Sequence, residues 1–419
     1  MYLIPFSLAA LWFTTMSASA EVLTRKDVVA AVLDGHPEVR AGEQAWRAVK
    51  ARSLQNRVLP DPEIEFEYEE LPGFFDTGQF GERTVSITQT IENPFKWFYR
   101  SRSSNFDSER SRFINYEMTR LRMASRAKVA FDRVLADQMI LMSETENLAL
   151  SQTLTNRARI RLDAGDVPKL ELLRSQVEEA RAQNRLKQAD ARLTVSRSEL
   201  NLLVGRKPGS PLELRGSLSF KATVLNQGAI KKRAIRSRPD LRGAELGLAT
   251  ERAARSAALA GWIPDLHLGV GRQTISSGGA RDSFWHASFG FSLPVWAPFR
   301  QRGESIEASA NRARAEFELA SIERSAELEI EQALQAYRSN QEQIQLFKDR
   351  ILNLAEETFR VAHESHSQGK ATYLDLLEAQ KTLMASKVEH IETLFAFRTA
   401  LAELELAVGF DLTGEVITE

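Results

Sequence analysis

Two carboxylates, Asp375 and Glu378, stand three residues apart in the stretch SHSQGKATYLDLLEAQ, which begins at Ser365. Residues three apart share one face of a helix, so both side chains are expected on the same side. Several such acids around a narrow aqueous bore would favour cations and raise some of their pKa values by mutual repulsion. A second interpretation, compatible with the first, is that acids in a first helical turn complement the helix N-terminus.

Other residues with reactive side chains do not combine into a site. His363 and His366 lie close together in sequence, but two imidazoles without a third nearby ligand make a poor metal site, and a solvated helix end explains them. The run GVGRQTISSGG at Gly269 lacks the GxGxxG spacing of a phosphate loop, and no HExxH is present. Nothing assembles a nucleophile, a base and an orienting group, so we expect no enzyme, no cofactor and no metal.

The acidic stretch has a near-copy, RLDAGDVPKLELLRSQ, which begins at Arg161, and Gly369 stands 204 residues after Gly165. Similar matches recur along the chain. They are HPEVRAGE at His36 with RPDLRGAE at Arg238, VLPDPEIEF at Val58 with WIPDLHLGV at Trp262, ENPFK at Glu92 with WAPFR at Trp296, and ELNLLVG at Glu199 with ELELAVG at Glu403. Such spacing indicates a tandem duplication of one unit.

Each unit is expected to contain a first helix, a β-hairpin and a long helical hairpin. The first helices are predicted over residues 25–59 and 230–263, each ended by a proline. Two runs without Gly or Pro, 95–164 and 304–368, predict long helices, the second with a heptad seam. The predicted segments are a signal peptide (1–20), a first repeat (21–205, with a β-hairpin at 62–92 and a helical hairpin at 95–205), a linker with a short strand (206–228), a second repeat (229–409, with a β-hairpin at 265–296 and a helical hairpin at 303–409) and a C-terminal tail (410–419).

Composition narrows the class of protein. Lys and Arg number 55 and Asp and Glu 56, which argues against a nucleic-acid binder. The absence of cysteine excludes disulfides and thiolate chemistry. The apolar start MYLIPFSLAALWFTTMSASA ends in a small-x-small cleavage site, so we expect export from the cytoplasm.

The strand segments alternate apolar and polar residues, as in EIEFEYEE at Glu63. Two hairpins supply four strands, whereas a membrane barrel needs at least eight, so a chain of this kind would cross a membrane only as an oligomer. Four tryptophans suit membrane-interface anchors; they are Trp97, Trp262, Trp285 and Trp296. The alternative is a small β-layer on a soluble periplasmic coiled-coil scaffold or adaptor.

With this plan assembled, the chain resembles the TolC family of outer-membrane efflux proteins. The resemblance rests on GDVPKLELLRSQ, GKATYLDLLEAQ, PDPEIEF, PDLHL and the closing LLVG and LAVG. The stretch HPEVRAGEQAWRAVKARSLQNRVLPDPEIEFEYE, which begins at His36, looks most like the heavy-metal and cation efflux branch of that family. It implies a mainly α fold with a β-barrel part: a homotrimer with a 12-stranded outer-membrane barrel and a 12-helix periplasmic coiled-coil tunnel.

The resemblance also implies partners and sites. The chain would lie in outer-membrane lipid of a Gram-negative bacterium as the exit duct of a tripartite efflux system. Its partners would be a periplasmic adaptor and an inner-membrane transporter of the RND type, and it would bind no nucleic acid. The resemblance does not decide whether the cargo is metal ions or drugs. The acidic constriction would consist of Asp375, Glu378 and Glu171, although Arg174 replaces the acid that matches Glu378. The helix tips that contact the adaptor would present Gly165, Leu172, Leu173, Gln176, Gly369, Leu376, Leu377 and Gln380.

Overall fold

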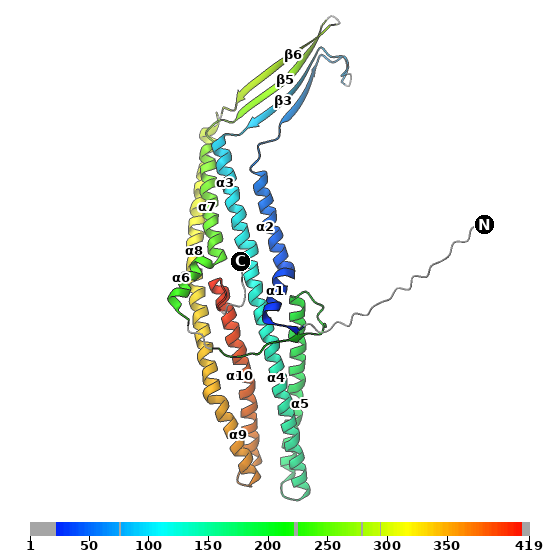
Figure 1. Ribbon diagram of the computed structural model, residues 1–419, viewed down its shortest axis with the longest axis vertical. Helices are drawn as coiled ribbons and strands as arrows, with labels where there is room; N and C mark the ends of the chain where they lie inside the picture. The colour runs from blue at the N-terminus through cyan, green and yellow to red at the C-terminus, as the bar shows by residue number, and fades with distance from the viewer. Residues whose placement is uncertain (1–21, 75–76, 222–224, 278–279, 294, 413–419) are drawn as a thin grey trace, which may run out of the picture. The chain divides into compact units, whose positions relative to one another are not determined.

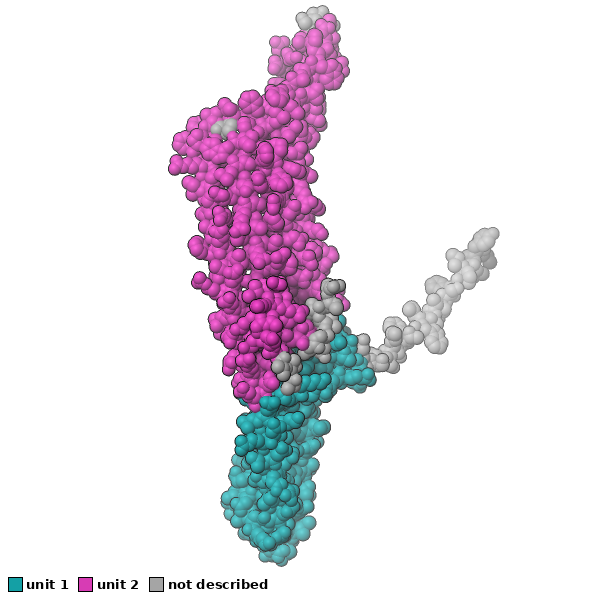
Figure 2. All heavy atoms as spheres, turned by 60° about the vertical axis from the view of Figure 1, so that its left-hand side comes forward, with its two compact units in different colours: residues 1–32, 127–221, 343–398 teal, residues 33–126, 222–342, 399–419 magenta. Residues whose placement is uncertain are grey.

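A computed structural model describes residues 22–74, 77–221, 225–277, 280–293 and 295–412. The predicted signal peptide, residues 1–20, lies outside the described residues. The chain forms two compact units, coloured separately in Figure 2. Unit 1 comprises residues 1–32, 127–221 and 343–398, and unit 2 comprises residues 33–126, 222–342 and 399–419. Each unit therefore contains segments from both sequence repeats.

Most described residues lie in helices (Figure 1). The helices are α1 (Arg25–Gly35), α2 (Pro37–Gln55), α3 (Pro94–Ser111), the π-helical turn η1 (Arg112–Glu117), α4 (Met118–Asp163), α5 (Lys169–Leu203), α6 (Gln227–Ser237), α7 (Pro239–Ala260), α8 (Ala297–Leu346), the π-helical turn η2 (Phe347–Ile351), α9 (Leu352–Ser367) and α10 (Tyr373–Val408). No described helix combines the length and the apolar character that a membrane crossing requires.

The first helix of each repeat is broken, which corrects the prediction of single helices over residues 25–59 and 230–263. His36 and Arg238 have extended backbones, with φ −68° and ψ 133° at His36 and φ −66° and ψ 123° at Arg238. Each precedes a proline, Pro37 or Pro239, that begins a new helix. The proline ring disfavours helical geometry at the preceding residue, and this effect outweighs the helix-forming residues on either side.

The long helices occur where the Gly- and Pro-free runs predict them, with one π-helical turn in each run. The heptad seam is buried before the second of these turns, with Ile330, Tyr337 and Ile344 at 2% exposure or less. After the turn, Leu354 and Val361 are 61% and 48% exposed in the single chain. A π-helical turn holds an extra residue and shifts the phase of the following helix, so a strict seven-residue count does not continue across it.

The strands form two sheets. In unit 1, β1 (Val22–Leu23) pairs in parallel with β4 (Glu213–Leu214), which lies within the predicted linker strand. In unit 2, β2 (Glu63–Glu69), β3 (Glu82–Ile91), β5 (Leu266–Ser277) and β6 (Ala280–Phe291) form an antiparallel sheet in that order. β3 and β5, from different repeats, lie side by side at its centre (Figure 1).

The register places apolar side chains on one face of the four-stranded sheet. Ile64 pairs with Ile87, which pairs with Val270 on its other side. Opposed residues in antiparallel strands share a face, so these side chains form a continuous apolar surface. It is exposed in the chain; Ile64, for example, retains 62% exposure. The other face carries the four glutamates of β2 and is polar along β2.

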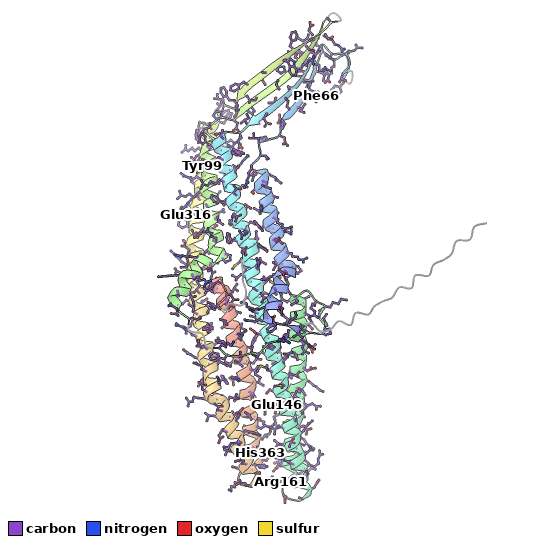
Figure 3. All side chains as sticks on the ribbon, in the orientation of Figure 1. Phe66, Tyr99, Glu146, Arg161, Glu316 and His363 are labelled. Carbon is purple, nitrogen blue, oxygen red and sulfur yellow. The ribbon has the colours of Figure 1, made fainter. Side chains whose placement is uncertain are left out.

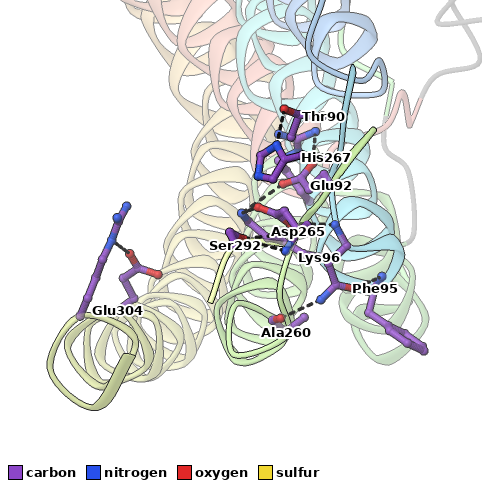
Figure 4. A network of polar contacts seen from close by, with 12 residues as sticks. Thr90, Glu92, Phe95, Lys96, Ala260, Asp265, His267, Ser292 and Glu304 are labelled. Atoms are coloured by element: carbon purple, nitrogen blue, oxygen red, sulfur yellow. Dashed lines mark hydrogen bonds and ion pairs between the residues drawn. The ribbon is translucent and has the colours of Figure 1, made fainter. Parts of the chain in front are cut away.

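A polar network ties the sheet to the helices below it in unit 2 (Figure 4). The side-chain oxygen of Asn93 caps α3 by accepting a hydrogen bond from the Phe95 backbone amide. The backbone N–H of Asn93 donates to the Asp265 carboxylate at 2.8 Å. Its side chain also donates to the Ala260 carbonyl at 2.9 Å. Lys96 lies 3.7 Å from the same aspartate. Asp265 of the second strand entry therefore anchors its hairpin to α3 as well as forming a turn.

Candidate functional site

The two repeated turns have the same backbone geometry. Gly165 and Gly369 have φ +82° and +72°, in the left-handed region where glycine has no steric penalty. After each glycine the next amide, of Asp166 or Lys370, donates to a carbonyl five residues back, at 2.8 and 2.9 Å. This is the hydrogen-bond pattern of a glycine-ended helix, so the shared glycine serves the turn itself.

Asp375 lies at the start of α10 and forms a capping box with Thr372. Its carboxylate accepts hydrogen bonds from the Thr372 amide at 2.9 Å and hydroxyl at 2.7 Å, and its amide donates to the threonine hydroxyl. These hydrogen bonds hold the pKa of the fully exposed Asp375 carboxyl below its usual value. Asp375 therefore has a structural role at the helix start, as the second interpretation predicts, and it stays ionised. Glu378, one turn later, is exposed.

Glu171, the predicted third acid, is placed differently. Its side chain is only 12% exposed and lies 3.9 Å from both Arg161 and His366. In this single chain Glu171 is therefore partly buried, pairs with Arg161 within the first tip and lies beside His366 of the second tip. The sequence did not predict this placement of Glu171, because its neighbours Arg161 and His366 come from two other helices, α4 and α9.

His366 organises the contact between the tips. Arg161 donates to His366 Nε2 at 3.2 Å, so that nitrogen is an acceptor and the proton resides on Nδ1, which lies 3.2 Å from the Ala371 carbonyl. Tyr373 packs against the imidazole, and burial raises the pKa of its phenol to about 12. Figure 3 labels Arg161 on α4 and His363 on α9. His363 lies 3.0 Å from Arg157.

These arginine contacts do not suit a metal site at the two histidines. Among the residues that the structure describes, no three His, Cys, Asp or Glu side chains gather as metal ligands would. The tip cluster is better described as a small polar contact, which encloses a cavity of about 200 Å³.

The predicted adaptor-contacting residues divide into two groups. Leu376, Leu377 and Gln380 of the second copy are at most 5% exposed, because they pack within unit 1, so their side chains are not available to an external partner. Gln380 donates to the Ser151 hydroxyl at 3.0 Å and lies 3.3 Å from the Asn147 amide oxygen. In the first copy, Leu173 and Gln176 are exposed and Leu172 is half-buried. The two copies share a motif but use its side chains differently.

A groove that the sequence did not predict lies beside Gln380, between α4, α5 and α10. It encloses about 540 Å³. Its apolar side chains are Leu377, Met384, Ala385 and Val388. Ion pairs flank these: Arg185 lies 3.4 Å from Glu144, and Lys381 lies 3.2 Å from Glu178. The signal in the sequence is the apolar i, i+4 pair Met384 and Val388 within a charged helix.

The four tryptophans predicted as interface anchors are exposed to different degrees. Trp285 and Trp296 are 75% and 73% exposed, and Trp262 is 45% exposed. Trp97 is 36% exposed and donates its indole N–H to the Arg57 carbonyl at 2.8 Å. Trp285 and Trp296 are therefore the two most exposed of the four rings, and Trp97 is held by a hydrogen bond within the chain.

Comparison with known proteins identifies this architecture. The sequence model of the family described as outer membrane efflux protein matches residues 231–410, which form the second repeat. The second repeat is thus similar to outer membrane efflux proteins. The resemblance to TolC-type channels is thereby confirmed, and the duplication extends the family pattern to the first repeat.

Relatives in the outer membrane efflux family match over different lengths. The chain is 25% identical over 369 residues to the cobalt-zinc-cadmium resistance protein CzcC of Cupriavidus metallidurans, covering 85% of this chain and 82% of that protein. It is 27% identical over 287 residues to nodulation protein T of Rhizobium leguminosarum bv. trifolii, covering 66% of this chain and 59% of that protein. The matched part thus spans less than two thirds of nodulation protein T.

Solved structures share the fold. A crystal structure of CusC superposes with a TM-score of 0.78 at 17% identity, covering 92% of each chain. The open state of the Neisseria gonorrhoeae MtrE outer membrane channel gives a TM-score of 0.78 at 17% identity, covering 93% of this chain and 89% of that one. The predicted fold class, mainly helical with a duplicated helix and hairpin unit, is confirmed.

Proposed function

We propose that this chain is the outer-membrane exit duct of a tripartite efflux system, which passes substrates from an inner-membrane pump and a periplasmic adaptor to the exterior. The observation that carries the proposal is the four-stranded sheet. Its apolar face is exposed, and the outer edges of β2 and β6 have no second strand beside them among the described residues. A soluble scaffold would bury such a face or place charges on it. Hydrocarbon is its natural environment.

The functional unit is proposed to be a homotrimer. Three chains supply twelve strands from three four-stranded sheets, enough to close a barrel without edges in outer-membrane lipid. The helical part would form the periplasmic tunnel, with the bulk of each chain in the periplasm of a Gram-negative bacterium. A passive duct of this kind takes its energy from the pump.

The constriction is proposed at the exposed acids of the second tip. Threefold symmetry would place three copies of Asp375 and of Glu378 around the bore, which favours cations over anions. Glu171 is proposed to act beside them by holding the two tips together. The adaptor would meet the exposed first-copy side chains Leu173 and Gln176.

Metal cations are proposed as cargo, delivered by a transporter of the RND type. This rests on the 25% identity to a cobalt-zinc-cadmium resistance protein over 85% of the chain and on the acidic side chains at the tip. Deleting the gene should lower the tolerance of its host to cobalt, zinc or cadmium salts. Unchanged metal tolerance with increased sensitivity to organic drugs would assign a drug cargo instead.

Fractionation and electrophysiology test the duct itself. Outer membranes should yield a trimer that needs detergent, migrates differently after boiling and conducts ions in planar bilayers. A monomer recovered from osmotic-shock fluid without detergent would instead support the soluble periplasmic scaffold or adaptor.

A further inference from the structure

The charged residues of the four-stranded sheet are sorted by sign between its two faces. Side chains alternate along a strand, and residues paired in register share a face, so the pairing assigns every strand residue to one face. Six acids lie on the face opposite Ile64; they are Glu63, Glu65, Glu67, Glu69, Glu82 and Asp282. The three arginines of the strands, Arg83, Arg272 and Arg281, lie on the same face as Ile64. The apolar face therefore carries positive charge and no acid along the described strands.

The arginines lie toward the end of the sheet that is remote from the helices (Figure 1). β5 runs away from α7, and Arg272 lies in its second half. Arg83 pairs with Thr274, two residues further along β5, and Arg281 pairs with Ser276, two residues further again. In the proposed duct this end of the sheet faces the exterior, so the arginines would lie at the level of the outer leaflet.

No acid of the described chain neutralises these arginines. Arg83 is half-buried, Arg272 and Arg281 are exposed, and none of the three forms an ion pair among the described residues. The Nε of Arg83 is buried and has no hydrogen-bond partner there. By contrast, Arg100 of α3 lies 2.6 Å from Glu92. A guanidinium has five donors and no acceptor, so the three arginines offer unused donors to an external anion.

Phe80 holds two of the three guanidinium groups. The central carbons of the Arg83 and Arg281 guanidiniums lie 5.2 and 5.1 Å from the centroid of the Phe80 ring, which is 8% exposed. Tyr68 packs edge-on against the same ring, and Arg281 donates to the Gly78 carbonyl at 3.3 Å. Side chains held in this way lose little rotamer freedom when they bind an anion. The two guanidiniums are therefore preorganised around one ring.

A hollow of about 300 Å³ joins the arginines to the apolar side chains of the same face. Arg83 and Arg272 line it together with Ile87, Val270 and Trp285. Arg83 and Arg272 are diagonal neighbours on β3 and β5, and such residues lie about 7–8 Å apart. Two guanidiniums at that spacing can converge on one phosphate. Ile87 lies opposite Val270 on the side nearer the helices, where the acyl chain of a lipid would lie.

We propose that Arg83, Arg272 and Arg281 bind the phosphate groups of a phosphorylated glycolipid in the outer leaflet, with its acyl chains against the apolar face. The three guanidiniums occupy three successive levels of the sheet, which fits a lipid with two phosphates better than a lipid with one. The inference rests on the proposed function, because only a sheet in the outer membrane meets such a lipid. It adds a ligand that the duct does not require, since arginine on a lipid-facing strand is unfavourable unless an anion or the interface compensates it.

Lipid A with two phosphates and the same lipid without phosphates are the probes. Native mass spectrometry of the detergent-solubilised trimer measures the affinity for each. The unmodified trimer should bind the diphosphorylated lipid at least about tenfold more tightly than the dephosphorylated one. The variant Arg83→Gln with Arg272→Gln and Arg281→Gln should bind both lipids equally weakly.

A second triple variant controls for the loss of positive charge. Arg242, Arg312 and Arg314 lie on helices α7 and α8 and pair with glutamates near the surface. Replacing all three with glutamine removes the same number of charges away from the sheet. This variant should keep the preference of the unmodified trimer for the diphosphorylated lipid, and its loss here would overturn the assignment to the sheet.

The outcomes separate the lipid site from the duct. Equal binding of the two lipids by a conducting, unmodified trimer would overturn the inference and leave the proposed channel intact. Inorganic phosphate is the third probe, and displacement of the diphosphorylated lipid by an equal concentration of phosphate would assign the site to the free anion instead. An unmodified chain that is monomeric and soluble without detergent would overturn both proposals.

A single substitution protects the test against a folding failure. Arg272 has no hydrogen bond, ion pair or ring contact among the described residues, so Arg272→Gln leaves the packing around Phe80 unchanged. This variant should weaken binding of the diphosphorylated lipid by about threefold or more. An unchanged affinity in an assembled trimer would remove Arg272 and the hollow from the site.

Discussion

Asp375 combines two roles that one substitution can separate. Its carboxylate caps α10 through Thr372 and is also an exposed charge at the proposed constriction. Asparagine keeps a side-chain oxygen that can accept from the Thr372 amide but carries no charge. Glu378 has no comparable capping contact, because it lies one turn inside the helix.

We expect Asp375→Asn, combined with Glu378→Gln, to raise single-channel conductance and weaken block by multivalent cations while thermal stability stays near that of the parent. Asp375→Ala should lose the cap as well and unfold at a lower temperature than the asparagine variant. Planar-bilayer recording and thermal unfolding measure the two effects. Unchanged conductance in the charge-neutral variant would remove the acids from the constriction.

His366 offers a test of whether the tip contact holds the channel closed. Its imidazole accepts from Arg161 of the first tip and reaches the Ala371 carbonyl within the second tip, so His366→Ala removes one contact between the tips and one within the second tip. We expect higher basal conductance and greater uptake of large antibiotics by whole cells. His363→Ala, which removes only the contact to Arg157, is the matched control and should have a smaller effect. Equal effects of the two variants would argue against a specific role of His366.

The ion pair at the second proline break predicts a pH dependence of stability. Burial alone raises the pKa of the Asp240 carboxyl, but hydrogen bonds and the positive charge of Arg238 outweigh it and leave that pKa below its usual value. A carboxyl whose pKa is lower in the folded state contributes stability that is present above its unfolded pKa, near 4, and is lost as the pH falls through the folded pKa.

Thermal melting between pH 6 and pH 3 should therefore show a loss on the order of 1 kcal/mol that Asp240→Asn abolishes. The variant should be less stable than the parent at pH 6 and approach it at pH 3. Exposed Glu245→Gln, at the end of a surface pair with Arg242, is the control and should leave the pH profile nearly unchanged. A pH-independent difference between Asp240→Asn and the parent would contradict this.

At the scale of helices and strands, local sequence patterns predicted the features that depend on residues close together in the sequence, such as helix bounds and turns. The return helix α10 spans Tyr373–Val408, as its uninterrupted pattern indicates, and both tip glycines take positive φ. The proline breaks at Pro37 and Pro239 were also visible in the sequence, but helix-forming residues on both sides obscured them.

Contacts between distant segments were not predictable in the same way. Gln380 and Gln176 close the same motif, yet only Gln380 is buried against Asn147 and Ser151. The two glutamines differ in burial because Gln380 faces α4, and the repeated motif does not specify which helix lies opposite it. The inward turn of Glu171 has the same origin, since Arg161 and His366 come from two other helices.

The tip turn provides a stability test at this scale. Gly369 and Gly303 both have open space where a Cβ would be added, but only Gly369 has a positive φ. Gly369→Ala should therefore lower the free energy of unfolding by about 1 kcal/mol through backbone strain alone. Gly303→Ala, inside α8, should raise it by up to about 1 kcal/mol, since alanine favours helix. Denaturant unfolding measures both, and equal signs would contradict the assigned backbone geometry.

For the whole molecule, β2 of the sheet places Ile64, Phe66 and Tyr68 on one face and its glutamates on the other. Along β2 the polar face carries Glu63, Glu65, Glu67 and Glu69, all exposed. In a closed barrel the apolar face meets lipid, so these carboxylates line the water-filled interior. Three chains would bring twelve of these glutamates to the bore. In the sequence they lie far from Asp375 and Glu378 of the proposed constriction. Cation preference would then be a property of the assembled barrel as well as of the tips.

Neutralising this row tests that property directly. The variant Glu63→Gln, Glu65→Gln and Glu67→Gln should shift the reversal potential in a salt gradient toward anion permeation, because nine carboxylates are lost from a trimer while the hairpin pairing is unchanged. The charge-conserving variant Glu63→Asp, Glu65→Asp and Glu67→Asp should retain the selectivity of the parent. Gel mobility before and after boiling verifies that both variants are trimers. A reversal potential unchanged in the glutamine variant would mean that β2 does not turn its acidic face to the bore, and the orientation assigned to the sheet would have to be reversed.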